Sequence, residues 1–81
     1  MSENNIKKFK TILAKILLIE ESKINDELSR KTIKEWDSMT HLMLVSELES
    51  AFEITMYDDD IIEIQTIADI KKVLKKLGIS I

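Results

Sequence analysis

Apolar side chains recur at helical spacing in three stretches of the chain, with polar residues between them. This spacing predicts amphipathic helices over residues 4–19, 38–53 and 66–77. The apolar positions that define the three stripes are Ile6, Phe9, Ile12, Leu13, Ile16, Leu17 and Ile19, then Met39, Leu42, Val45, Leu48 and Phe52, then Ile67, Ile70, Val73, Leu74 and Leu77. Thr66 with Asp69 resembles a capping box at the start of the last helix, and Gly78 is a natural stop after it.

A short additional helix is expected over residues 59–64, ahead of the last long one. Asp58, Asp59 and Asp60 precede an isoleucine-rich segment there. Carboxylates in a first helical turn are stabilised by the helix dipole.

Residues 20–36 are more polar, and their few apolar side chains do not define one helix face. Asn25 and Asp26 favour a turn. The segment is predicted to be a long ordered loop with a short helical turn near residues 26–30. Four apolar side chains are expected to hold it in place: Ile24, Leu28, Ile33 and Trp36.

Composition supports an all-α fold. The chain has 81 residues, no Pro and one Gly, so it lacks the turn residues of a β-rich domain. We expect a single domain over residues 1–81, a four-helix bundle of three longer helices and a short third one, with the long loop between helices one and two. Its predicted core consists of Ile12, Leu13, Ile16, Leu17, Leu42, Val45, Leu48, Phe52, Ile67, Ile70, Val73 and Leu74.

The charge distribution and the absence of cysteine argue against several classes of function. The net charge is −3, and no Lys or Arg lies between Lys34 and Lys71. An acidic middle repels nucleic acid and attracts partners with basic patches. The chain has no Cys and one His, so we expect no disulfide and no metal site. No apolar run is long enough to span a membrane, and nothing resembles a signal peptide. We therefore expect a cytoplasmic, monomeric protein.

Ser38 stands at the start of the second predicted helix, and three hypotheses compete for it. Asp37, Ser38 and His41 are the residue types of a hydrolase triad, but within one helical turn Asp37 cannot also orient the far nitrogen of His41. Alternatively, Asp37 or Ser38 caps the helix and does nothing more. Third, a hydroxyl at a helix N-terminus is a suitable attachment point for a phosphate, whose charge the helix dipole stabilises.

The third hypothesis gains weight from a family resemblance. The run Trp36-Asp37-Ser38-Met39, the Leu-Glu-x-x-Phe register ending at Phe52, and the segment from Thr66 to Ile70 resemble the acyl carrier proteins. The resemblance extends from the first helix to Gly78. The family motif is Asp-Ser-Leu, and here it is Asp-Ser-Met.

The resemblance implies a carrier rather than an enzyme. Ser38 would bear 4'-phosphopantetheine, taken from coenzyme A, whose terminal thiol holds an acyl group as a thioester. Asp37 would belong to the motif that a phosphopantetheinyl transferase recognises. Acyl-loading and acyl-using enzymes with basic patches would be the other partners. The residues expected to take part in partner recognition are Asp37, Met39, Met43, Glu47, Glu49, Glu53, Asp58, Asp59 and Asp60.

Two departures from the family pattern point to a specialised carrier. Fatty-acid members usually have acids where this chain has Thr40 and Met43. Trp36 before Asp-Ser resembles carriers of surface polysaccharide, lipid or natural-product assembly. The alternative to a carrier is an unmodified acidic helical interaction module in which Ser38 is only a helix cap.

Overall fold

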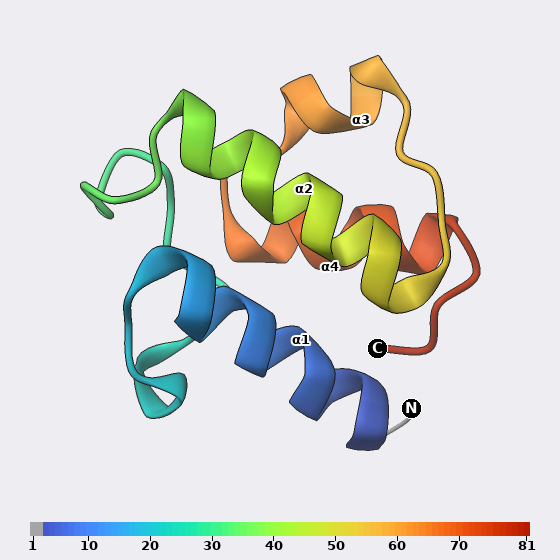
Figure 1. The fold of residues 1–81 in the computed structure, drawn as a ribbon, viewed down its shortest axis with the longest axis horizontal. Coiled ribbons are helices and arrows are strands. Elements are labelled where there is room, and N and C mark those ends of the chain that lie inside the picture. Colours follow the sequence, from blue (N-terminus) through green and yellow to red (C-terminus); the bar gives the residue numbers. More distant parts are fainter. Residues whose placement is uncertain (1–2) are drawn as a thin grey trace.

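A computed structural model describes residues 3–81 as four α-helices and one short 3-10 turn. The helices are α1 (Glu3–Leu17), α2 (Ser38–Phe52), α3 (Asp58–Glu63) and α4 (Ile67–Lys76). In Figure 1, α1 and α2 run in opposite directions, and α4 lies behind α2. The short α3 lies on the side of α2 that faces away from α1. No strand occurs within residues 3–81. The predicted all-α four-helix architecture is confirmed, with helix ends within two residues of those expected.

The three longer helices end in a left-handed backbone conformation. Leu18 follows α1 with φ 57°, Glu53 follows α2 with φ 55°, and Gly78 lies just beyond α4 with φ 93°. In each case the next amide bonds back to a helical carbonyl, as Ile19 does to Ala14 at 3.2 Å. Only glycine adopts this conformation without steric cost. The predicted continuation of the first helix to residue 19 is therefore wrong, because the helical backbone stops before Leu18.

The core is built from the inner faces of the three longer helices. All but two of the predicted core residues are buried. Ile16 is half-buried at its edge. Leu42 is 61% exposed, so its assignment to the core is wrong.

The register of α2 explains the error at Leu42. Its buried residues are His41, Leu44, Val45, Leu48 and Phe52, which recur every three or four positions. The solvent-exposed face of α2 is also apolar. A helix with apolar residues on both faces gives no periodicity that tells the inner face from the outer one.

The long loop is ordered, as predicted, but its helical turn lies elsewhere. The turn is η1 (Glu21–Lys23) rather than residues 26–30. Ile33 and Trp36 are buried, while Ile24 and Leu28 are partly buried against the core.

Backbone hydrogen bonds also tie this loop to the start of α4. The Ile67 amide donates to the Leu28 carbonyl at 3.0 Å, and the Arg30 amide donates to the Gln65 carbonyl at 2.9 Å. The first of these bonds satisfies an amide that the start of α4 leaves unpaired. The predicted capping box is present, since the Asp69 amide donates to the Thr66 hydroxyl and the Thr66 amide donates to the Asp69 carboxylate, both at 3.1 Å.

The register of α2 can be tested with a matched pair of substitutions. Leu48→Ala should lower the free energy of unfolding by about 2–5 kcal/mol, because it opens a cavity at a fully buried site. Leu42→Ala should change it by less than about 0.5 kcal/mol, because Leu42 faces solvent. Urea unfolding followed by circular dichroism measures both. Equal losses at the two positions would contradict the register.

Candidate functional site

Asp37 is the residue that caps α2. Its backbone is extended, and its carboxylate accepts a hydrogen bond from the Thr40 amide at 2.9 Å. This bond lowers the pKa of Asp37 below its usual value, with smaller contributions from the Thr40 hydroxyl and the Met39 amide. An ionised carboxylate at this position also interacts favourably with the helix dipole.

Ser38 is therefore the first residue of α2 rather than its cap. Its side chain is exposed, and no group within residues 3–81 hydrogen-bonds to its hydroxyl. The alternative in which Ser38 serves only as a helix cap is wrong, because Asp37 occupies that position. The hydroxyl is left accessible at the positive end of a 15-residue helix.

His41 lies one turn further along and faces the core. Its side chain is buried, with 4% of its surface exposed. The indole N–H of Trp36 donates to His41 Nδ1 at 3.0 Å. Nδ1 must then be the unprotonated nitrogen, so Nε2 carries the proton and donates to the Ile61 carbonyl at 2.9 Å.

This arrangement excludes a hydrolase triad at Ser38. Both nitrogens of the only histidine are engaged within the fold, so neither can take a proton from Ser38. Asp37 bonds to the Thr40 amide and not to the imidazole. The sequence analysis missed the Trp36–His41 pair. The available signal was that His41 has the helical spacing of the buried residues Leu44, Val45 and Leu48.

Burial lowers the pKa of His41 below its ordinary value, and the positive charge of Arg30 adds to this effect. The hydrogen bond with the Ile61 carbonyl opposes it. Protonation would also place an N–H on Nδ1, facing the indole N–H of Trp36 with no acceptor between the two donors. The neutral imidazole is thus the form that the folded chain stabilises.

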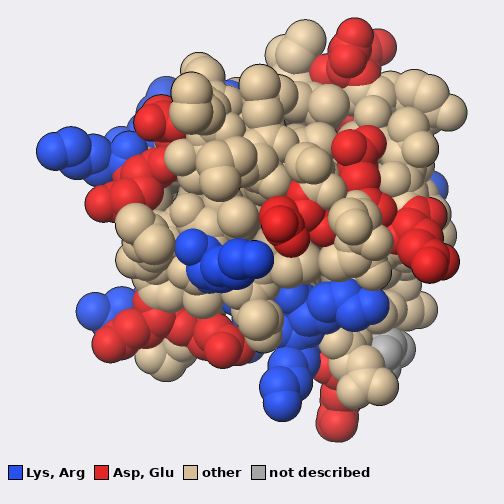
Figure 2. All heavy atoms as spheres, in the orientation of Figure 1, with Lys and Arg blue, Asp and Glu red and all other residues tan. Residues whose placement is uncertain are grey.

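An apolar surface lies beside Ser38 on the first turns of α2. Met39, Leu42 and Met43, which we name the outer apolar patch, are between half and three-quarters exposed. They share the outer face of α2 because they are spaced three and four residues apart. Figure 2 shows a largely uncharged area over the first half of α2, with acidic side chains beyond it. Contiguous exposed apolar residues of this kind mark interaction surfaces more often than isolated ones do.

The structure separates the predicted acidic residues of α2 into different environments. Glu47 is half-buried, with its carboxylate 3.9 Å from the Lys15 ammonium. Glu49 is also half-buried and accepts a hydrogen bond from the Met56 amide at 2.8 Å, which fixes the chain after α2. Glu53 is exposed at the left-handed end of the helix.

The three acids of α3 differ in the same way. Asp58 and Asp59 are exposed, whereas Asp60 is buried and forms an ion pair with Lys76 of α4. The hydrogen bond from Lys76 lowers the pKa of Asp60 despite its burial, and Asp60 in turn raises the pKa of Lys76. The Tyr57 amide also donates to Asp60, at 3.3 Å. Asp60 therefore connects α3 to α4 and presents no free carboxylate to a partner.

The start of α2 fits a covalently attached phosphate ester. The Ser38 hydroxyl is exposed and unengaged, so modification would break no hydrogen bond of the fold. The helix dipole would stabilise the added negative charge. The Thr40 amide would not contribute, because Asp37 already occupies it. The helix dipole and the accessibility of the Ser38 hydroxyl are therefore the two features here that would suit such a group.

The pH dependence of stability should report on His41. Its pKa is lower in the folded chain than the unfolded value of 6.5, so the unfolded chain binds more protons between these two values. The free energy of unfolding should therefore fall as pH decreases below about 6.5, by at most about 1.4 kcal/mol per pH unit, and level off below the folded pKa. Urea unfolding between pH 7.5 and 5.5, followed by Trp36 fluorescence, measures this loss.

His41→Gln is the matched control, because glutamine retains polar atoms but does not titrate. Asp37, Asp60 and Asp69 have lowered pKa values and titrate below this range. The variant should be less stable than the parent at pH 7.5 and should show no loss between pH 7.5 and 5.5. A parent chain whose stability is constant over this range would contradict the buried neutral imidazole.

Comparisons with known proteins identify the fold. No family model matches the sequence, and no curated protein does. Among solved structures, the chain is similar to a protein assigned as an acyl carrier protein (Rv0033) from Mycobacterium tuberculosis, with a TM-score of 0.77 and 21% sequence identity. The match covers 88% of this chain and 95% of that one. Within residues 3–81, no helix has the length and apolar character needed to cross a membrane. The structural match shows that the chain has the fold of the acyl carrier proteins.

Proposed function

We propose that this protein is an acyl carrier protein, modified with 4'-phosphopantetheine on Ser38. The observation that carries the proposal is the exposed Ser38 hydroxyl, which makes no hydrogen bond within residues 3–81 because Asp37 caps α2 in its place. The acyl carrier fold around it supports the same conclusion. An exposed serine beside a capping aspartate is unremarkable by itself, whereas the two observations together point to an attachment site.

The chain supplies the acceptor oxygen, and other proteins supply the catalysis. A phosphopantetheinyl transferase would remove the proton from Ser38 Oγ, and this oxygen would attack the phosphate of coenzyme A that bears the pantetheine. The new P–O bond to Ser38 replaces the bond to the second phosphate of the pyrophosphate, and adenosine 3',5'-bisphosphate leaves. The bound group supplies a terminal thiol, which a chain without cysteine lacks. His41 takes no part as a base, because both of its ring nitrogens are engaged within the fold.

Partner enzymes would approach the face of α2 that begins at Ser38. The outer apolar patch and the exposed carboxylates of Glu53, Asp58 and Asp59 are the groups available there. Methionine side chains adapt to partner surfaces of different shape. Exposed carboxylates contribute roughly 0–1 kcal/mol each to ion pairs with basic patches and lose strength with salt. Contacts of this kind suit a cytoplasmic carrier that visits several enzymes.

The uncharged first half of α2 favours a specialised pathway over general fatty-acid synthesis. Thr40 and Met43 stand where fatty-acid carriers usually have acids, and both side chains lie on the outer part of α2. A partner evolved for this surface would need an apolar contact area beside any basic one. Lipid, surface-polysaccharide or natural-product assembly fits this description.

Modification of Ser38 is tested by intact mass. After incubation with coenzyme A, Mg²⁺ and a broad-specificity phosphopantetheinyl transferase, the apo protein should gain one phosphopantetheine. Ser38→Ala should gain none, because the acceptor oxygen is gone. It should keep the parent's circular dichroism spectrum, because Asp37 still caps the helix. Ser46→Ala, an exposed serine on the same helix, should be modified like the parent.

Two results would overturn the proposal. One is the absence of a mass gain on a folded apo sample under conditions that load a known carrier. The other is an equal gain on the parent and on Ser38→Ala, which would place the modification elsewhere. The first result would leave the fold as an unmodified interaction module, and the second would exclude Ser38 as the attachment site.

The outer apolar patch should affect the rate of loading more than it affects stability. Met39→Ala and Met43→Ala should each change the free energy of unfolding by less than about 0.5 kcal/mol, since both side chains are mostly solvent-exposed. Each should reduce the initial rate of loading by the transferase several-fold. Thr55→Ala, an exposed position beyond the end of α2, is the control. Parent-like rates for both methionine variants would exclude a contact at the patch.

A further inference from the structure

A concave site lies on a part of the molecule that does not include Ser38. Its cavity has a volume of about 340 Å³ and is lined by α1, loop residues 24–26, α4 and Ile81. No residue of α2 or α3 lines it. This volume lies within the range of small-molecule sites, which is roughly 300–1,000 Å³.

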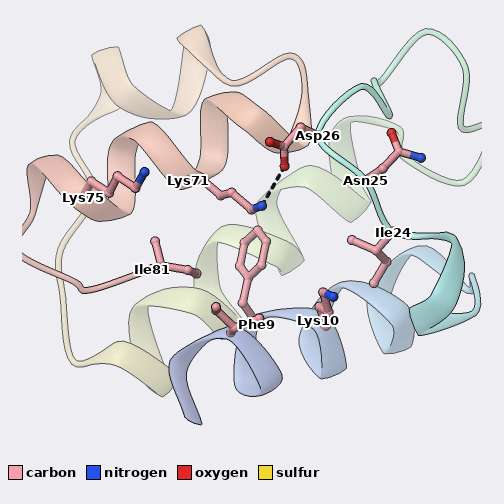
Figure 3. Close-up of a pocket in the computed structure, with 9 residues that line it drawn as sticks. Phe9, Lys10, Ile24, Asn25, Asp26, Lys71, Lys75 and Ile81 are labelled. Carbon is pink, nitrogen blue, oxygen red and sulfur yellow. Dashed lines mark ion pairs between the residues drawn. The ribbon is translucent and has the colours of Figure 1, made fainter. Parts of the chain in front are cut away.

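The floor of the cavity is apolar. Phe9 and Ile81 are buried, and Ile6 and Ile24 are partly buried against the core. Figure 3 shows the Phe9 ring rising from α1, with Ile81 on one side and Ile24 on the other. An apolar ligand segment placed here would be removed from water, which favours binding in proportion to the apolar area covered.

The rim of the cavity is cationic, although the whole chain is acidic. Lys10 of α1 and Lys71 and Lys75 of α4 line it, together with the carboxylate of Asp26. Lys71 pairs with Asp26 at 2.7 Å. Lys10 and Lys75 have no ion-pair partner within the described part of the chain. The three lysine side chains carry three positive charges and Asp26 carries one negative charge. The side chains at the rim therefore have a net charge of +2 above an apolar floor.

We propose that this cavity binds a small amphiphilic anion, with an apolar segment against the apolar floor and a negative head group at the lysine rim formed by Lys10, Lys71 and Lys75. The concave shape and the limited volume favour a small molecule over a helix or a strand of a partner. Lysine ammonium groups recognise charge rather than the geometry of a head group. The site therefore accepts either a carboxylate or a phosphate monoester.

This inference is independent of the proposed function. The cavity uses neither Ser38 nor the outer apolar patch. A Ser38→Ala chain should therefore bind the anion as the parent does, even though it can no longer be loaded. Failure of one proposal leaves the other intact.

The test uses octanoate and octyl phosphate as probes, each below its micelle concentration, with octanol as the neutral control. Amide chemical shifts of the apo protein should change saturably in the first half of α1, in residues 24–26 and around Lys71 and Lys75. Octanol should bind more weakly than either anion. The ratio of octanoate to octyl phosphate affinity tells which head group the site prefers.

Matched lysine variants identify the cationic rim. Lys75→Gln and Lys10→Gln should each weaken binding of both anions by about two- to fivefold, the effect of one partly exposed ion pair. Lys72→Gln and Lys7→Gln remove the same charge from neighbouring exposed positions outside the cavity and should leave binding unchanged. Ile24→Phe, which fills part of the cavity, should weaken binding without affecting the lysines.

Three outcomes would overturn the proposal. Shifts that do not saturate would show that no site exists. Equal affinity for octanol and the anions, or equal losses at the cavity lysines and the control lysines, would remove the role of the rim. Shifts confined to α2 and α3 would place the ligand at a different site.

Discussion

A buried imidazole needs a hydrogen-bond partner for each ring nitrogen, and His41 finds both partners in other elements of the fold. Trp36 at the end of the long loop supplies the donor, and Ile61 in α3 supplies the acceptor. One side chain of α2 thereby fixes the end of the loop ahead of it and the short helix beyond it. The start of α2 takes its position from the same contact, because only Asp37 lies between Trp36 and the first residue of the helix.

The helices could be predicted from the sequence, whereas the face that α2 turns inward could not. Helical spacing of apolar residues and acids at a helix start are local properties, so the spacing located the three longer helices and the aspartates located α3, all to within two residues. The outer and inner faces of α2 are both apolar, and the choice between Leu42 and His41 depends on partners far along the chain. The end of α1 was missed for a different reason, since nothing in the leucine at position 18 indicates a left-handed backbone.

The candidate site was predictable in its location but not in the roles of its residues. Asp37 and Ser38 are equally good caps by residue type, and only the geometry of the Thr40 amide assigns the role to Asp37. In the sequence, the three aspartates of α3 form one uninterrupted acidic run. In the structure, Asp60 is buried and forms an ion pair with Lys76 of α4. The cavity beside Lys10 and Lys75 draws its lining from segments at both ends of the chain, so no local pattern predicts it.

A chain of this length has little apolar surface to spare, because small domains bury a smaller share of their surface than large ones. Within residues 3–81, six large hydrophobic side chains nevertheless remain exposed, and three of them form the outer apolar patch beside Ser38. Only Asp60 of the six residues of α3 is buried, and Ile61 packs against the edge of the core. Polar contacts add to this packing, through Asp60 to Lys76 and through the Ile61 carbonyl to His41. Specific polar contacts thus hold an element that the apolar core covers only in part. None of these contacts uses the exposed face of α2. That face therefore has no structural role and is free to contact successive partners.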